Sequence, residues 1–163
     1  RHFLNVAGVG FDAEVAARFN RRTSRGVRGY ISECLKAVWS YECASYAVTT
    51  DGETLRGPRF VVAFANGREY GNGLVLVPNA DPLDGRLDMV VVAGGSPLIQ
   101  FWRARRLVWR RLAPAAGVRR ARVKGAVIQG DRMRCHVDGE PFEASGRIEV
   151  RLAPGALRVA GVA

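Results

Sequence analysis

The sequence predicts a mainly β fold, an antiparallel β-sandwich with a few peripheral helices. Strand-like segments outnumber helical ones, and many are short and joined by Gly or Asp-Gly turns, which favour hairpins. Residues 133–138 also alternate strictly between apolar and polar side chains, as a strand with one buried face does. Short strands with frequent turn signals are typical of sandwiches.

The first quarter of the chain is expected to hold one strand and two helices. Residues 2–9 read as a strand that ends in a glycine-rich segment. Residues 11–20 follow as a short helix, with Asp12 as its N-cap. In residues 30–41 the apolar side chains recur with helical spacing, which indicates the second helix.

The middle of the chain is expected to be β-structure. Asp51-Gly52 is a hairpin turn between residues 45–50 and the strand that starts at Thr54. Further strands are expected at residues 60–65, 74–77 and 87–93.

The last third combines one helix with more strands. Pro97 precedes a helix at residues 98–112. In residues 133–138, His136 and Asp138 lie on the face opposite the apolar side chains, so that face is expected to be free for chemistry, with His136 at the surface. The remaining strands are expected at residues 121–129, 147–152 and 157–162.

Composition excludes several classes of protein. A chain of 163 residues has the size of one domain, and 48% hydrophobic residues exclude disorder. No apolar run reaches the ~18 residues of a membrane span. The 3 cysteines form no C-x-x-C pair, so neither a disulfide framework nor a zinc site is indicated, and a reducing cytoplasm fits best.

Positive charge is concentrated in one stretch of the chain. The net charge is +10, and residues 89–130 contain no Asp or Glu. Such a stretch attracts polyanions. Within it, the helix expected at residues 98–112 carries Trp102 and Trp109 among arginines, which is typical of an interfacial membrane helix. The alternative is an ordinary helix that buries its apolar face on the sheet.

Two acidic turns are candidate sites. In the segment Asp81-Pro82-Leu83-Asp84-Gly85-Arg86, a carboxylate and peptide oxygens could converge on a hard cation. The alternative is a plain turn capped by Asp side chains. In Asp138-Gly139-Glu140, a carboxylate could accept a proton from a substrate hydroxyl, and the alternative is a bare hairpin turn.

Five motifs in order resemble the bacterial lipid kinases related to diacylglycerol kinase, a family that includes sphingosine and ceramide kinases. That family has two domains, and a G-G-D-G-T loop in the first binds ATP. This chain lacks that loop, so the resemblance implies that residues 1–163 are a single C-terminal β-sandwich domain, the second domain of an NAD kinase/diacylglycerol kinase-like fold, inactive by itself. The motifs lie at residues 3–13, 66–73, 78–88, 137–141 and 154–159.

The resemblance also implies roles for individual residues. Glu140 matches the proton acceptor for the lipid hydroxyl, and Asp138 beside it is the second candidate catalytic carboxylate. Glu14 matches a head-group contact of sphingosine kinases. Asp84 matches a Mg²⁺ ligand, helped by the peptide carbonyls of Asp81 and Arg86. Asn72, where relatives often have a glycine, and the rigid Asp81-Pro82 pair depart from the family pattern.

The resemblance favours an ATP-dependent, diacylglycerol-like lipid kinase, with a lipid substrate, ATP and Mg²⁺, at the cytoplasmic face of the membrane. The alternative is a non-catalytic basic module that binds anionic membrane surfaces. Nucleic-acid binding is disfavoured, because the expected strands show no interleaving of aromatic and basic residues. The oligomeric state stays open, with a homodimer among the alternatives.

Overall fold

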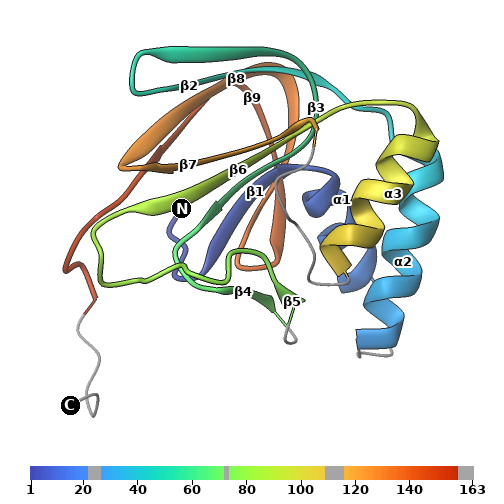
Figure 1. Cartoon of the computed structure of the whole chain (residues 1–163), viewed down its shortest axis with the longest axis horizontal. Helices are drawn as coiled ribbons and strands as arrows, with labels where there is room; N and C mark the ends of the chain where they lie inside the picture. Colours follow the sequence, from blue (N-terminus) through green and yellow to red (C-terminus); the bar gives the residue numbers. More distant parts are fainter. Residues whose placement is uncertain (22–26, 72–73, 109–115, 158–163) are drawn as a thin grey trace.

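The structure is a computed structural model that describes residues 1–21, 27–71, 74–108 and 116–157. Three helices and nine strands lie in this part of the chain (Figure 1). The helices are α1 (Phe11–Asn20), α2 (Val27–Ser40) and α3 (Pro97–Val108). The strands are β1 (Val6–Gly10), β2 (Ser45–Thr50), β3 (Glu53–Ala65), β4 (Glu69–Gly71), β5 (Leu74–Val75), β6 (Leu87–Ala93), β7 (Val118–Val123), β8 (Gly125–Val137) and β9 (Glu140–Arg151).

The predicted antiparallel β architecture with peripheral helices is confirmed, and its seven-stranded sheet closes on itself through a ring of four strands. β1 pairs with β3 and β8, and β2 pairs with the same two strands. The ring closes because β3 and β8 are 13 residues long, and different parts of each strand pair with β1 and β2. β6 and β7 extend the sheet beyond β3, and β9 extends it beyond β8.

One core fills the interior of this closed sheet. Val48, Val62, Met89, Ile128 and Met133 are fully buried there. They come from β2, β3 and β8 of the ring and from the neighbouring β6, and Val9 of β1 belongs to the same cluster, so side chains from all four ring strands meet. Burying apolar side chains of this size stabilises the fold by about 1.5–3 kcal/mol each.

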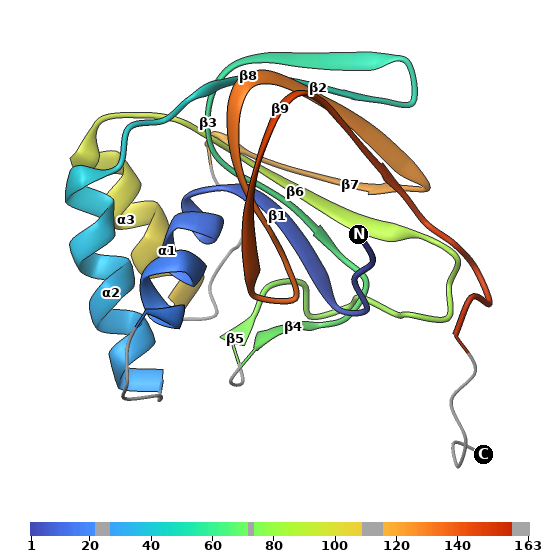
Figure 2. The same cartoon turned by 180° about the vertical axis from the view of Figure 1, so that it is seen from behind.

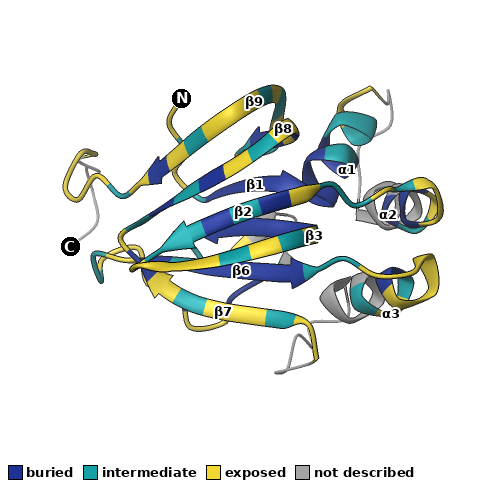
Figure 3. Cartoon of the chain, turned by 90° about the horizontal axis from the view of Figure 1, so that it is seen from above, coloured by how far each residue is buried: buried dark blue, intermediate teal, exposed yellow. Residues whose placement is uncertain are grey.

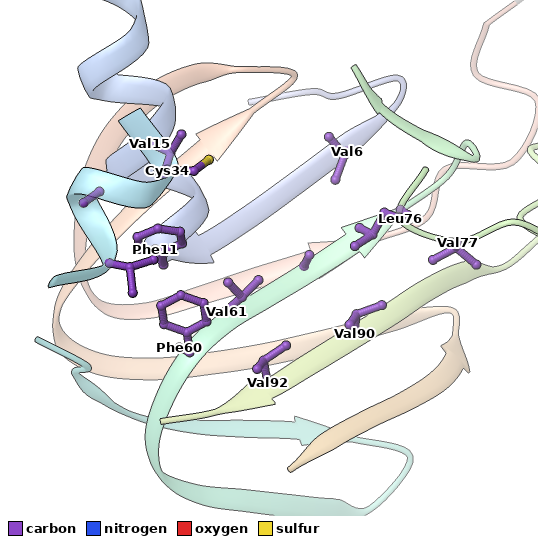
Figure 4. Close-up of a cluster of buried hydrophobic side chains, with 14 of the residues drawn as sticks. Val6, Phe11, Val15, Cys34, Phe60, Val61, Leu76, Val77, Val90 and Val92 are labelled. Atoms are coloured by element: carbon purple, nitrogen blue, oxygen red, sulfur yellow. The ribbon is translucent and has the colours of Figure 1, made fainter. Parts of the chain in front are cut away.

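A second core lies on the outer face of β1, β3 and β6. Phe11 on α1 stacks on Phe60 of β3, with ring centroids 4.4 Å apart (Figure 4). Val90 and Val92 of β6 belong to the same cluster. The two cores bury these strands on both faces, which explains the unbroken apolar run at residues 60–65. Figure 3 shows β1 and β6 dark with burial, whereas β7 and β9 at the sheet edges are largely exposed.

The three helices gather at one end of the sheet. α2 lies between α1 and α3 and contacts both. α1 contacts β1, β8 and β9, so its side chains face the β8–β9 hairpin. Seen from behind, the helices remain together at the same end, away from the start of β6 (Figure 2).

Some predicted details differ from the structure. The first strand begins at Val6, four residues later than expected. Asp12 is not an N-cap: Gly10 occupies that position without a side-chain bond, and Asp12 is buried. His136 is buried instead of lying at the surface, with 2% of its area exposed, because α1 covers this face of β8. The strand expected at 157–162 and the helix end at 109–112 lie outside the described residues, apart from Leu157, which is not in a strand.

Candidate functional site

Two of the motifs meet at the end of the sheet where β1 begins. The Asn5 carbonyl oxygen accepts the backbone N–H groups of Asn66 at 2.8 Å and of Gly67 at 3.4 Å. The Asn5 side-chain amide donates to the carbonyl oxygen of Glu69 at 2.6 Å. A Cβ atom on Gly67 would lie 2.5 Å from the Asn5 side-chain oxygen, so any larger residue would displace the Asn5 side chain. The Asn5 and Asn66-Gly67 motifs therefore form one structural junction.

Asp138 belongs to the same junction. Its carboxylate accepts the backbone N–H groups of Leu4 at 2.7 Å, Asn5 at 3.0 Å and Val6 at 2.8 Å. Its own N–H donates to the Val6 carbonyl at 2.8 Å. With a φ of 47° it adopts the left-handed conformation, which Asp tolerates better than most residues. The Asp138 carboxylate, a candidate catalytic group, thus holds the first residues of the chain against the β8–β9 turn.

A buried pair, Asp12 and His136, contacts the same turn through a hydrogen bond from Gly139. His136 Nε2 lies 3.2 Å from Asp12 Oδ2, and His136 Nδ1 accepts the Gly139 N–H at 3.3 Å. Because Nδ1 is an acceptor here, the ring proton lies on Nε2 and is donated to Asp12. A Cβ on Gly8 would lie 1.8 Å from Asp12 Oδ2, so the first glycine of Gly8-Val9-Gly10 makes room for the pair. The two glycines of Gly8-Val9-Gly10 could have indicated that another group lies close to this backbone. They could not have identified that group as the pair of Asp12 with His136.

Glu140 lies just beyond this turn and its side chain faces solvent. It is the first residue of β9, and its backbone pairs with Val137 of β8. Besides the bond from Gly139 to His136, the turn accepts a hydrogen bond from the Asn20 amide to the Gly139 carbonyl at 3.1 Å. The predicted base is therefore an exposed carboxylate on a hairpin held from two sides.

Glu14 lies on α1, the helix that covers this hairpin. Its carboxylate accepts Arg18 Nε at 2.7 Å and pairs with Arg134 of β8. Burial alone would raise the pKa of Glu14, but the hydrogen bonds and charges of Arg18 and Arg134 outweigh it and hold the pKa below its usual value. The predicted head-group residue thus stands in an ion-pair network beside the Asp12–His136 pair.

The loop of residues 81–86 lies near the opposite end of β9. Glu140 begins that strand, whereas Asp84 lines a pocket of about 470 Å³ with residues that follow its end, Leu152 and Pro154. The structure therefore does not bring the predicted metal loop and the predicted base together.

Asp81 and Asp84 each cap the turn with a side-chain oxygen. Asp81 Oδ1 accepts the Leu83 N–H at 2.9 Å, and Asp84 Oδ1 accepts the Arg86 N–H at 2.8 Å. The other oxygen, Asp84 Oδ2, pairs with the guanidinium of Arg122 on β7. Sequence reasoning missed Arg122, because only the antiparallel pairing of β6 with β7 brings it to this loop.

The donor set of this loop does not fit Mg²⁺ while Arg122 is in place. Mg²⁺ prefers octahedral coordination by oxygen ligands, and both Asp84 oxygens already accept hydrogen bonds. In the described part of the chain, no group of three His, Cys, Asp or Glu side chains is placed to hold a metal ion. The expected metal ligands Asp84, Asp81 and Arg86 therefore form a hydrogen-bonded turn in this structure.

The helical end of the molecule exposes large apolar side chains. Trp102 and Leu98 on α3 are 53% and 58% exposed, and Trp39 on the neighbouring α2 is 59% exposed. Gln100 and Phe101 turn inward: Gln100 is 2% exposed, and the Phe101 ring centroid lies 5.7 Å from that of Trp39. The Leu98–Trp102 side of α3 therefore does not pack on the sheet as an ordinary helix face would; Trp109 lies outside the described residues.

The sequence of the chain matches one family over nearly its whole length. The model of the YegS C-terminal NAD kinase beta sandwich-like domain covers residues 5–161. The chain belongs to this family.

Curated relatives of this YegS C-terminal domain are lipid kinases. One is "Probable lipid kinase YegS-like" of Pseudomonas putida, 27% identical over 161 residues that cover 96% of this chain and 52% of that protein. Another is the "Diacylglycerol kinase" of Mycobacterium tuberculosis, 34% identical over 96 residues that cover 58% of this chain and 31% of that protein. The chain thus spans about half the length of its first relative.

Solved structures share the fold of this YegS C-terminal domain. A diacylglycerol kinase from Bacillus anthracis str. Sterne, 16% identical, gives a TM-score of 0.58 and covers 93% of this chain and 47% of that one. Another structure from that organism, 23% identical, gives 0.64 and covers 94% and 52%. No helix in the described residues is both long and apolar enough to cross a bilayer.

Proposed function

We propose that this chain is the C-terminal, base-carrying domain of an ATP-dependent lipid kinase that phosphorylates a diacylglycerol-like hydroxyl. One observation carries the proposal: Glu140 is an exposed carboxylate on a hairpin fixed by Asp138 and His136. Membership in the YegS C-terminal domain family and the lipid kinase relatives support it.

In this proposal Glu140 accepts the proton of the lipid hydroxyl as its oxygen attacks the γ-phosphate of ATP. A base must lie within hydrogen-bond reach of the proton that it takes, so an exposed and rigidly held carboxylate suits the role. Mg²⁺, bound with ATP, would neutralise charge on the phosphates. The ATP-binding part would lie outside this chain, which therefore does not phosphorylate lipid unaided.

Replacing Glu140 by Gln in the full-length enzyme tests the base. General base catalysis contributes about 10²–10⁴-fold, so kcat should fall by about that factor. The melting temperature should stay within about 1 °C, since the Glu140 side chain faces solvent. Glu143→Gln is the matched control, because Glu143 is an exposed carboxylate on the same strand. Near-normal turnover of Glu140→Gln would remove Glu140 from the mechanism.

We further propose that the helical end docks on an anionic membrane surface at the cytoplasmic face. Exposed Trp39, Leu98, Ile99 and Trp102 gather on α2 and α3, which lie side by side in Figures 1 and 2. The acid-free stretch of residues 89–130 includes α3 and supplies positive charge for anionic lipid. This docking could accompany catalysis or act without it.

Vesicle sedimentation with and without anionic lipid tests the docking. Trp102→Ser should lower the bound fraction several-fold, because it removes an exposed aromatic anchor. Leu83→Ser is the control, since Leu83 is 91% exposed but lies in the loop of residues 81–86, away from the helices. Equal losses for both variants, or binding that ignores lipid charge, would contradict the docking surface.

A further inference from the structure

We propose that Arg122 takes the place of a divalent cation at the loop of residues 81–86, so that this loop is held without metal. The resemblance implies Mg²⁺ at Asp84, whereas the structure gives that carboxylate a guanidinium from β7. The proposal concerns only this loop and does not depend on the kinase function.

The geometry of Asp84 leaves a cation little room. Its side chain is 17% exposed, so the carboxylate is largely withdrawn from water and needs a partner of opposite charge. Oδ1 accepts the Arg86 N–H within the turn, and Oδ2 accepts Arg122 Nη2. A divalent cation at Oδ2 would therefore compete with the Arg122 guanidinium for that oxygen.

The position of Arg122 is fixed by the sheet. Arg122 stands opposite Asp88 in the antiparallel pairing of β6 with β7, four residues beyond Asp84. Asp88 is the second residue of β6, the strand that follows the loop. Arg122 therefore contacts Asp84 through its side chain and stands opposite Asp88 through its backbone, so it links the loop to the sheet. A metal ion bound between the loop and the sheet would likewise hold the loop in place.

The surrounding charge also disfavours a second cation. The pocket beside Asp84 is lined by Arg86 and Lys124, both exposed and positively charged. With Arg122 these residues place three positive charges around Asp84. Like charges within a few ångströms repel Mg²⁺, whereas removal of Arg122 would leave two carboxylates less compensated and favour it.

Thermal unfolding of the wild-type chain and of Arg122→Gln, in millimolar Mg²⁺ and in EDTA, tests the proposal. The wild-type melting temperature should be the same in both. In EDTA, the melting temperature of Arg122→Gln should lie about 2–4 °C below that of the wild type. Millimolar Mg²⁺ should restore at least half of this difference. Arg119→Gln is the matched control, because Arg119 on the same strand forms an exposed ion pair with Glu53. It should show no response to Mg²⁺.

Two results would overturn the proposal: a wild-type melting temperature that rises with Mg²⁺, or an Arg122→Gln variant that ignores it. The double variant Asp84→Asn with Arg122→Gln should lose the response, which assigns the Mg²⁺ effect to Asp84. If Arg122→Gln does not fold, the proposal can still be tested on the wild-type chain by NMR, with Mn²⁺ as a paramagnetic probe. Broadening of the Gly85 and Arg86 amide signals at millimolar Mn²⁺ would overturn the proposal, and unchanged signals would support it.

Discussion

Two of the three Asp-Gly turns of this molecule, at Asp84 and Asp138, look alike in sequence but use their carboxylates differently. Asp138 accepts three backbone N–H groups from the segment that leads into β1. Asp84 accepts one backbone N–H within its own turn and is neutralised by the side chain of Arg122. The first carboxylate therefore holds the start of β1 against the β8–β9 turn, whereas the second fixes a loop to β7. The difference teaches that the role of a turn carboxylate depends on its donors, and the donors that distinguish these two turns lie far away in the sequence.

Paired substitutions should separate the two turns, and the larger effect is expected at Asp138. Asp138→Asn keeps a residue that tolerates the left-handed backbone but places an NH₂ group against a backbone N–H, so it should cost about 2–3 kcal/mol. Asp84→Asn should cost about 1 kcal/mol, since Arg122 is 56% exposed and water screens the pair. Urea denaturation measures both.

Salt provides the control for this pair of substitutions. In 1 M NaCl the loss caused by Asp84→Asn should shrink, because salt screens a partly exposed ion pair. The loss caused by Asp138→Asn should persist, because its short-range bonds go to neutral backbone groups. If both substitutions lowered the free energy of unfolding equally and with the same salt dependence, the two carboxylates would stabilise the fold in the same way.

Local patterns predicted the elements but not the partners of their side chains. The helix at 11–20 and the strand at 87–93 have the predicted limits, since periodicity and flanking glycines define them. The strands expected at residues 121–129 and 133–138 leave a gap that includes Gly130, yet Gly130 lies at a bulge of the continuous strand β8. A glycine inside a strand is compatible with either a turn or a bulge, and only pairing with β9 decides.

The candidate site was predictable to a smaller extent. The Asp-Gly-Glu segment does form a hairpin turn with Glu140 exposed, as strand alternation and turn chemistry indicate. The burial of His136 could not be predicted, because Asp12 lies 124 residues away and α1 had to be placed over β8 first. The same holds for Arg122 and Asp84, which are 38 residues apart. Such contacts depend on topology, which the local pattern does not contain.

The Asp12–His136 pair offers an intermediate test of the Asp138 turn. Gly8→Ala should cost about 1–3 kcal/mol, because the new methyl group would displace Asp12 from His136. Gly139→Ala is the control: its φ is 87°, but its Cβ would meet open space, so about 1 kcal/mol of backbone strain is expected. Urea denaturation gives the stabilities, and histidine ¹⁵N shifts report whether Nε2 keeps its proton. An unaltered tautomer with wild-type stability in Gly8→Ala would mean that the pair does not support the turn.

Substitution of Glu14 should have the smallest effect on stability. Its carboxylate lies between two arginines, which is a third arrangement beside those of Asp138 and Asp84. Because Arg18 and Arg134 lower its pKa in the folded chain, ionised Glu14 contributes stability above its unfolded pKa of about 4.3. That contribution disappears as pH falls through the lowered folded value. Glu14→Gln should therefore cost under about 1 kcal/mol at pH 7 and nothing measurable once Glu14 is protonated in both states.

Urea titrations of the wild-type chain and Glu14→Gln between pH 7 and pH 3 follow this loss, and Arg134→Gln tests its cause. In a chain that already carries Arg134→Gln, the cost of Glu14→Gln should shrink, since one of the two guanidinium partners is gone. A cost that stays constant down to pH 3 would point to packing, not charge, as the contribution of Glu14. If the cost falls with pH as expected, the three carboxylates rank by their hydrogen bonds to the backbone first and by their arginine partners second.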